Sequence, residues 1–186
     1  MSNEKYSHWT FDVHAEGLRL RDLTRWHERF VWEHKKASNQ ASDYINELCC
    51  MVDVSFEMFA ELWPKYREAF DNVTYSEQKI IEIQSQLLEL KQTELHDRIS
   101  ISLSTLRHDR MFEWKADRDN VLSIIIGLRQ DARKFVNHWG MRTYEAKNLG
   151  ERATYRAKFQ AALTKRDQVE SMLQDVSAFA ARITDW

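Results

Sequence analysis

Apolar side chains recur in alternating steps of three and four residues along most of this 186-residue chain. The first run begins near Ala15, and the most regular run extends from Tyr155 to Ile183. Such spacing places the apolar side chains on one face of a helix, as in the seam of a coiled coil. The sequence therefore predicts an all-α fold: an elongated antiparallel bundle of three to five long amphipathic helices with coiled-coil-like seams. Six residues of the last run are candidates for a helix-seam interface: Tyr155, Phe159, Val169, Leu173, Val176 and Ile183.

Residues that favour turns are scarce. Only four glycines and one proline are present, far fewer than a chain of many short elements would need. We therefore expect a single helical domain over residues 1–186, with an irregular N-terminus over residues 1–14. Long helices are expected over residues approximately 15–70, 76–139 and 151–184.

Three positions inside these helices carry signals that interrupt or bend a helix. Residues 36–42, with Ser38 near the centre, are rich in small and polar side chains, and charged residues crowd around His108. Pro64 lacks the N–H group that a helical hydrogen bond requires, so a kink is expected there. Whether the helices break near Ser38 and His108 stays open at this point.

Capping patterns predict two of the helix ends. Thr74, followed three residues later by Glu77, is typical of a capping box, which predicts a connection over residues 71–76. Gly140 stands where a helix C-terminal glycine is expected, and residues 141–150 would form the next connection.

Charge and the N-terminal sequence limit the class of protein. The formal net charge is −2, so the chain as a whole is not a polycation. The first residues lack the basic and apolar segments of a signal peptide, and no apolar run is long enough to span a membrane. The only two cysteines, Cys49 and Cys50, are expected to be buried thiols of a reducing compartment. These features favour a cytoplasmic protein.

Residues with catalytic or metal-binding chemistry are present but do not form a strong pattern. His27 and His34 lie seven residues apart, on one face of the first helix, and are expected to be polar residues of a helix interface. None of the seven histidines follows a glutamate by three residues, and no His-Glu-x-x-His, Cys-x-x-Cys or glycine-rich phosphate loop occurs. We expect no metal, no cofactor and no small-molecule substrate.

One short motif is shared with an enzyme family. The segment from Arg133 to His138 resembles the Arg-x4-6-His motif of HEPN ribonucleases, which are small all-α proteins. That resemblance implies a shared RNA-cleaving site at a dimer interface, with Arg133 and His138 as catalytic candidates. Arg29 with His34, and Arg21 with His27, have similar spacing.

Charge is distributed unevenly along the chain. Residues 1–96 contain seventeen acidic and eleven basic residues, and residues 97–186 contain twelve acidic and sixteen basic residues. A candidate anion-binding patch lies in the second part, where three acidic residues accompany ten basic ones: Arg129, Arg133, Lys134, Arg142, Lys147, Arg152, Arg156, Lys158, Lys165 and Arg166. These ten residues, called the basic patch below, could bind lipid headgroups, nucleic acid or the acidic half of the protein.

The seams and the absence of reaction chemistry favour a non-enzymatic helical interaction or scaffold protein. It would act through contacts with a protein partner or with further copies of itself, as an oligomer or as a subunit of a larger assembly. One alternative is a membrane-curvature-binding dimer, because long antiparallel helices in a chain of this size resemble a BAR-type domain. The second alternative is the HEPN-like ribonuclease. The tryptophans lie on or beside apolar stripes, so nucleic acid is not expected as a partner.

Overall fold

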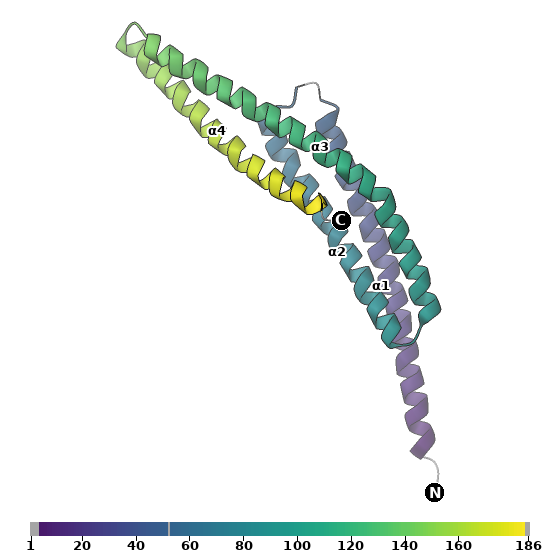
Figure 1. Ribbon diagram of the computed structural model, residues 1–186. Helices are drawn as coiled ribbons and strands as arrows, with labels where there is room; N and C mark the ends of the chain where they lie inside the picture. The colour runs from purple at the N-terminus through teal and green to yellow at the C-terminus, as the bar shows by residue number, and fades with distance from the viewer. Residues whose placement is uncertain (1–3, 52, 185–186) are drawn as a thin grey trace. The chain divides into compact units, whose positions relative to one another are not determined.

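A computed structural model describes residues 4–51 and 53–184 of the protein; for residues 4–16, 18, 109, 111, 112 and 184 it describes the backbone only. The predicted all-α bundle is confirmed, because four helices pack against one another and no strand occurs among the described residues. They are α1 (Glu4–Cys49), α2 (Phe56–Glu89), α3 (Thr93–Glu145) and α4 (Leu149–Thr184) (Figure 1). None of these helices is long and apolar enough to cross a membrane, over the part of the chain that is described.

Backbone contacts divide the chain, which was expected to form one domain, into two compact units. Unit 1 contains Met1–Asp43 and Lys65–Arg110, and unit 2 contains Tyr44–Pro64 and Met111–Trp186.

In unit 1, antiparallel helices bury their apolar seams. His34 of α1 contacts Glu77 of α2, and Gln84 of α2 donates a hydrogen bond of 2.8 Å to Ser100 of α3. Edge-to-face packing of Phe30 against Tyr75 adds an aromatic contact between α1 and α2. The apolar core cluster consists of Leu23, Ile80, Ile83, Leu87, Ile99 and Leu103.

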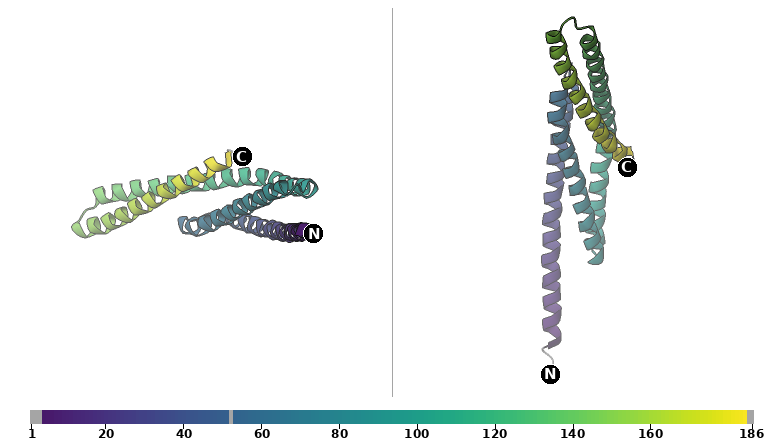
Figure 2. Two further views of the ribbon diagram at one scale, coloured as in Figure 1. Left: turned by 90° about the horizontal axis from the view of Figure 1, so that it is seen from below. Right: turned by 90° about the vertical axis from the view of Figure 1, so that its left-hand side faces the viewer.

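In unit 2, the C-terminal part of α3 lies antiparallel to α4, and the two remain side by side in all three views (Figures 1 and 2). The start of α2 packs on α4 through Trp63. The rings of Trp63 and Phe179 form a T-shaped pair with their centres 5.1 Å apart, and Trp63 Nε1–H donates a hydrogen bond of 2.8 Å to Asp175. Val121, Ile125 and Val169 are among the residues buried here.

The first connection differs from the prediction. Helix α1 begins at Glu4, so residues 4–14 are helical where an irregular N-terminus was expected, and residues 1–3 of that prediction lie outside the described residues. Helix α1 ends at Cys49 instead of continuing to residue 70. The helix does not break near Ser38, because the small side chains of residues 37, 38 and 41 are buried against neighbouring helices. Helix α2 starts after Ser55, whose hydroxyl accepts a hydrogen bond of 3.3 Å from the Met58 amide.

Two further boundary predictions are wrong in the same region. Helix α2 continues through the connection expected over residues 71–76; it also continues through Pro64, where the kink stays a prediction. Thr74 and Ser76 do not cap a helix, because their hydroxyls donate to the carbonyls of Phe70 and Asn72, four residues earlier. Cys49 and Cys50 are exposed rather than buried. Partial desolvation of the Cys49 thiol, reinforced by Asp117, nevertheless raises its pKa.

The turn between α2 and α3 was not predicted, since it contains neither glycine nor proline. Lys91 has a φ of 57°, the left-handed conformation that glycine usually supplies at the end of a helix. The Lys91 amide donates to the Leu88 carbonyl at 2.9 Å and the Gln92 amide donates to the Leu87 carbonyl at 2.8 Å. These two bonds are those of a Schellman motif, so the backbone closes the helix despite the lysine.

Replacing Lys91 with glycine is therefore expected to stabilise the protein. The left-handed conformation raises the free energy of a folded non-glycine residue by about 1 kcal/mol. Glycine avoids this cost, but its greater conformational freedom in the unfolded chain offsets part of the gain. We expect a gain of about 0.5 kcal/mol in the free energy of unfolding, measured by urea denaturation. Lys91→Ala is the control, because alanine retains the β-carbon; equal stability of the two variants would contradict this account.

Helix α3 is continuous, without a break at His108 and without a C-terminus at Gly140. It continues to Glu145, so the second connection contains only residues 146–148 rather than 141–150. Gly140 has a packing role instead. A β-carbon at this position would lie 3.3 Å from Cε2 of Phe159, so the glycine allows α3 and α4 to approach closely.

Candidate anion-binding site

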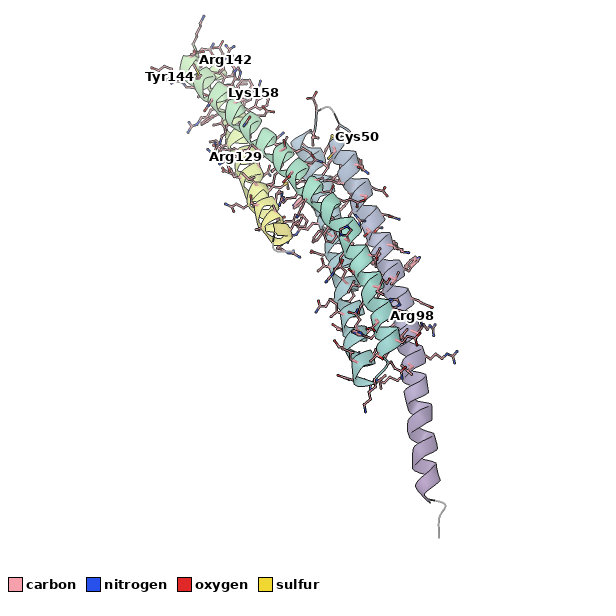
Figure 3. All side chains as sticks on the ribbon, turned by 45° about the vertical axis from the view of Figure 1, so that its right-hand side comes forward. Cys50, Arg98, Arg129, Arg142, Tyr144 and Lys158 are labelled. Atoms are coloured by element: carbon pink, nitrogen blue, oxygen red, sulfur yellow. The ribbon has the colours of Figure 1, made fainter. Side chains whose placement is uncertain are left out.

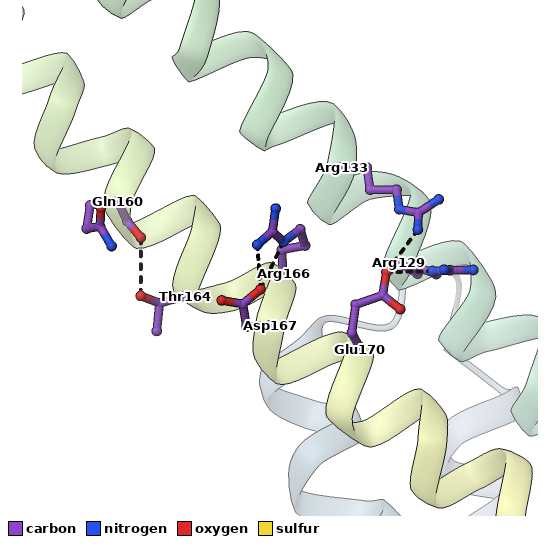
Figure 4. A network of polar contacts seen from close by, with 7 residues as sticks. All are labelled: Arg129, Arg133, Gln160, Thr164, Arg166, Asp167 and Glu170. Carbon is purple, nitrogen blue, oxygen red and sulfur yellow. Dashed lines mark hydrogen bonds and ion pairs between the residues drawn. The ribbon is translucent and has the colours of Figure 1, made fainter.

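The part of the basic patch farthest from the α3–α4 turn is neutralised within the chain. Glu170 on α4 accepts hydrogen bonds from Arg129 Nε at 2.7 Å and from Arg133 Nη2 at 3.1 Å (Figure 4). The hydrogen bond from Arg129, and that from Arg133 after it, hold the pKa of Glu170 below its ordinary value. A groove of about 440 Å³ beside these residues is lined by Arg133 and Arg166 and by the carboxylates of Asp167 and Glu170. The positive charges of the groove are therefore balanced by negative ones.

Three more cations of the patch have acidic partners in unit 2. Lys134 pairs with Asp131 at 2.9 Å, and Arg166 pairs with the adjacent Asp167 at 2.6 Å. Lys165 pairs with Glu57 at 2.8 Å, and this hydrogen bond lowers the pKa of Glu57. Lys165 is thus the patch residue whose observed partner belongs to the acidic first half of the chain.

The remaining five cations lie at the end of the α3–α4 hairpin, on residues 141–158, called the hairpin tip below. Arg142, Lys147, Arg152 and Arg156 have no acidic partner within ion-pair distance among the described residues. Lys158 lies 4.5 Å from the centre of the Trp139 ring, in a cation–π contact that leaves its charge unneutralised. In Figure 3, Arg142, Tyr144 and Lys158 lie near this end of the hairpin, and Arg129 lies farther from it.

Large apolar side chains are exposed at the same tip. Met141 is 64%, Tyr144 88% and Leu149 84% exposed. Tyr144 lies one residue before the end of α3, and Leu149 is the first residue of α4. The exposure of these three side chains beside unpaired cations makes the tip a candidate contact surface.

Local hydrogen bonds hold the turn at the tip in one conformation. Asn148 Oδ1 accepts a hydrogen bond of 2.8 Å from the Glu151 amide, and Glu151 Oε2 accepts one of 3.1 Å from the Lys147 amide. This reciprocal arrangement is similar to a capping box. Glu151 is therefore used as a helix cap, whereas Glu145 is an exposed carboxylate, and the tip retains an excess of three positive charges.

Aromatic packing below the turn fixes how the two helices meet. Trp139 lies 6.0 Å from Tyr155 between ring centres, and Gly140 allows the Phe159 ring to lie against α3. Because these contacts set the register of α3 against α4, they determine which cations reach the tip.

The HEPN-like residues do not converge within the chain. Arg133 and His138 are five residues apart on continuous α3, which places them about 140° apart around the helix axis. Arg133 donates to Glu170, and the exposed His138 ring packs edge-on against Trp139 at 4.8 Å. Of the similar pairs, Arg29 donates to Glu33, and His34 is buried against Glu77. Ribonuclease activity stays a prediction.

The predicted seam residues of α4 pack largely inside the chain. Val169, Val176 and Ile183 are buried, and Tyr155, Phe159 and Leu173 are half-buried. The seam therefore contributes to the fold of the single chain, and the oligomeric state stays a prediction.

His27 and His34 also have structural surroundings. His34 and Glu77 are each 1% exposed, with His34 Nε2 3.2 Å from Glu77 Oε1, and Arg107 Nε donates to Glu77 Oε2 at 2.9 Å. Burial lowers the pKa of His27. No cluster of three or more histidine, cysteine or acidic side chains suited to a metal occurs in the described part of the chain.

Comparisons with protein-family models, with curated proteins and with solved structures gave no match. Any assignment of function consequently depends on the chemistry of the surface itself. The charge pattern of the sequence located the basic patch, but the sequence analysis did not identify Met141, Tyr144 and Leu149 as exposed apolar residues beside it. The available signal was the presence of three large apolar residues within the charged segment expected to be a connection.

Proposed function

We propose that this chain is a non-enzymatic helical interaction protein of the scaffold type, and that the hairpin tip is its contact surface for an anionic partner. One observation carries the proposal. Half of the ten basic-patch cations are paired with carboxylates inside unit 2, whereas the five at the tip are not and lie beside three exposed apolar side chains.

A protein interface combines electrostatic attraction with the burial of apolar surface. Unpaired cations attract an oppositely charged surface over about one Debye length, roughly 8 Å at physiological ionic strength. Apolar side chains then supply the free energy of burial that charged pairs at a wet surface do not. The hairpin tip provides both kinds of group on a turn that is already ordered by Asn148 and Glu151, so little conformational entropy is lost on binding.

Neutralising two tip arginines is expected to weaken binding to a polyanion. Arg152→Gln/Arg156→Gln removes two unpaired charges and should reduce the affinity for poly-glutamate roughly tenfold, since exposed ionic contacts contribute up to about 1 kcal/mol each. The measurement is titration calorimetry at physiological salt, repeated at higher salt, where the affinity should fall further.

A matched control is available on the same hairpin. Arg133→Gln/Lys134→Gln produces the same change in net charge, but both residues are already paired, with Glu170 and Asp131. This variant should bind almost as the unmodified protein does. Equal weakening by both variants would mean that only total charge matters, and the tip would not be a contact surface.

A further inference from the structure

We infer that the anionic surface recognised by the hairpin tip is a lipid headgroup layer, on which the tip docks end-on with Tyr144 and Leu149 entering the interface. This inference rests on the proposed function and names its partner. The supporting observation is the order of apolar and cationic groups along the hairpin.

Positions along the helices give this order. Tyr144 and Leu149 lie at the facing ends of α3 and α4, and Arg142 and Arg152 each lie three residues from those ends. At a rise of 1.5 Å per residue, the two arginines are about 5 Å behind the apex. Arg156 and Lys158 follow about 10 Å and 14 Å behind the start of α4. Tyr144 and Leu149 thus lie at the apex, where Lys147 is the one cation of the connection, and the other four cations follow behind them.

A bilayer has the complementary order. Its polar layer is roughly 5–8 Å deep on each side of the hydrocarbon core. When Tyr144 and Leu149 reach the hydrocarbon boundary, Arg142 and Arg152 lie at the level of the phosphates. Tyrosine is favoured at this boundary because its ring is apolar and its hydroxyl is polar. The remaining cations then lie close enough to an anionic leaflet to be attracted to it.

Other anionic partners fit this order less well. A nucleic acid presents phosphates outward, so it would meet the cations while Leu149 and Met141 stayed in water. A protein partner would need a concave pocket shaped to an apex whose apolar side chains are 64–88% exposed. A fluid lipid layer needs no such shape. Because no described helix can span a membrane, the docking is peripheral.

The inference is tested with the full-length protein and two kinds of vesicle, phosphatidylcholine alone and phosphatidylcholine containing phosphatidylserine. Co-sedimentation should show binding to the serine-containing vesicles and little to the others. Arg152→Gln/Arg156→Gln should lower the partition coefficient about 30-fold, since each cation near an anionic surface contributes about 1 kcal/mol. Arg133→Gln/Lys134→Gln should change it little, because these residues lie about 20 Å along α3 from the turn.

A second variant tests insertion separately from charge. Tyr144→Ser/Leu149→Ser keeps every charge and removes the leading apolar groups, and it should lower the partition coefficient at least about tenfold. These side chains are exposed, so the variant should fold normally, with circular dichroism as the check. Binding equal to that of the unmodified protein would overturn the inference.

The outcomes separate this inference from the proposed function. Tip-dependent binding to poly-glutamate without binding to serine-containing vesicles would overturn the lipid assignment and leave the contact surface in place. If neither ligand shows a difference between the tip variants and the matched control, both proposals are wrong.

Discussion

Replacement of Glu77 with alanine is expected to lower the free energy of unfolding by about 3 kcal/mol. Glu77 is 1% exposed and accepts hydrogen bonds from two sides, with His34 at 3.2 Å and Arg107 at 2.9 Å. The variant would leave His34 Nε2 buried without this partner, in a ring whose Nδ1 already has no hydrogen-bond partner. Arg107 is 41% exposed and can be hydrated, which keeps the loss at the lower end of the range for a broken buried pair.

The same helix offers a matched control. Glu82 is exposed and pairs with Lys79 at 2.7 Å, three residues away on α2. Glu82→Ala removes the same chemical group from the same element, and it should cost less than about 0.5 kcal/mol. Urea unfolding monitored by circular dichroism measures both variants. Similar losses for the two would show that the burial of Glu77 does not matter to stability.

A larger loss, of about 4 kcal/mol, is expected for Trp63→Ala. Trp63 is 2% exposed, stacks on Phe59 with ring centres 6.1 Å apart, and forms a T-shaped pair with Phe179. The substitution removes an indole from the core of unit 2 and leaves a cavity that the surrounding rings can fill only in part. It also removes the hydrogen bond to Asp175.

Two further variants separate the causes. Trp63→Phe retains an aromatic ring and should cost only about 1–2 kcal/mol, mostly from the lost hydrogen bond and the smaller ring. Trp32→Ala removes the same side chain from an exposed site, where Trp32 is 60% exposed and contacts Lys36, and should cost less than about 1 kcal/mol. If Trp32→Ala proved as destabilising as Trp63→Ala, the burial of Trp63 would not explain its effect.

The sequence predicted the helices well and their ends poorly. Seam periodicity identifies helical character because burial of one face dominates helix stability in a bundle. The ends depend on local competition that the pattern does not reveal. Thr74 and Glu77 have the spacing of a capping box, yet burial of Glu77 against His34 and Arg107 favours an uninterrupted helix. Conversely, the turn at Lys91 is formed by backbone hydrogen bonds and carries no glycine.

Composition located the basic patch, but it could not divide the patch into paired and unpaired cations. That division depends on contacts between residues far apart in the sequence, such as Arg129 with Glu170 and Lys165 with Glu57. No spacing rule within one helix predicts such pairs. The exposure of Leu149 is likewise a result of the tertiary fold, since the sequence does not show which face of the first turn of α4 meets another helix.

The pair of exposed thiols at the C-terminal end of α1 has a practical consequence for any study of assembly. Cys49 and Cys50 are neighbours on the surface, so a disulfide between two copies of the chain can form there under oxidising conditions. The raised pKa of Cys49 keeps more of that thiol protonated at neutral pH, and alkaline buffers would speed its oxidation. A dimer observed without reductant would therefore report thiol chemistry at this turn before it reports an assembly built by the helices.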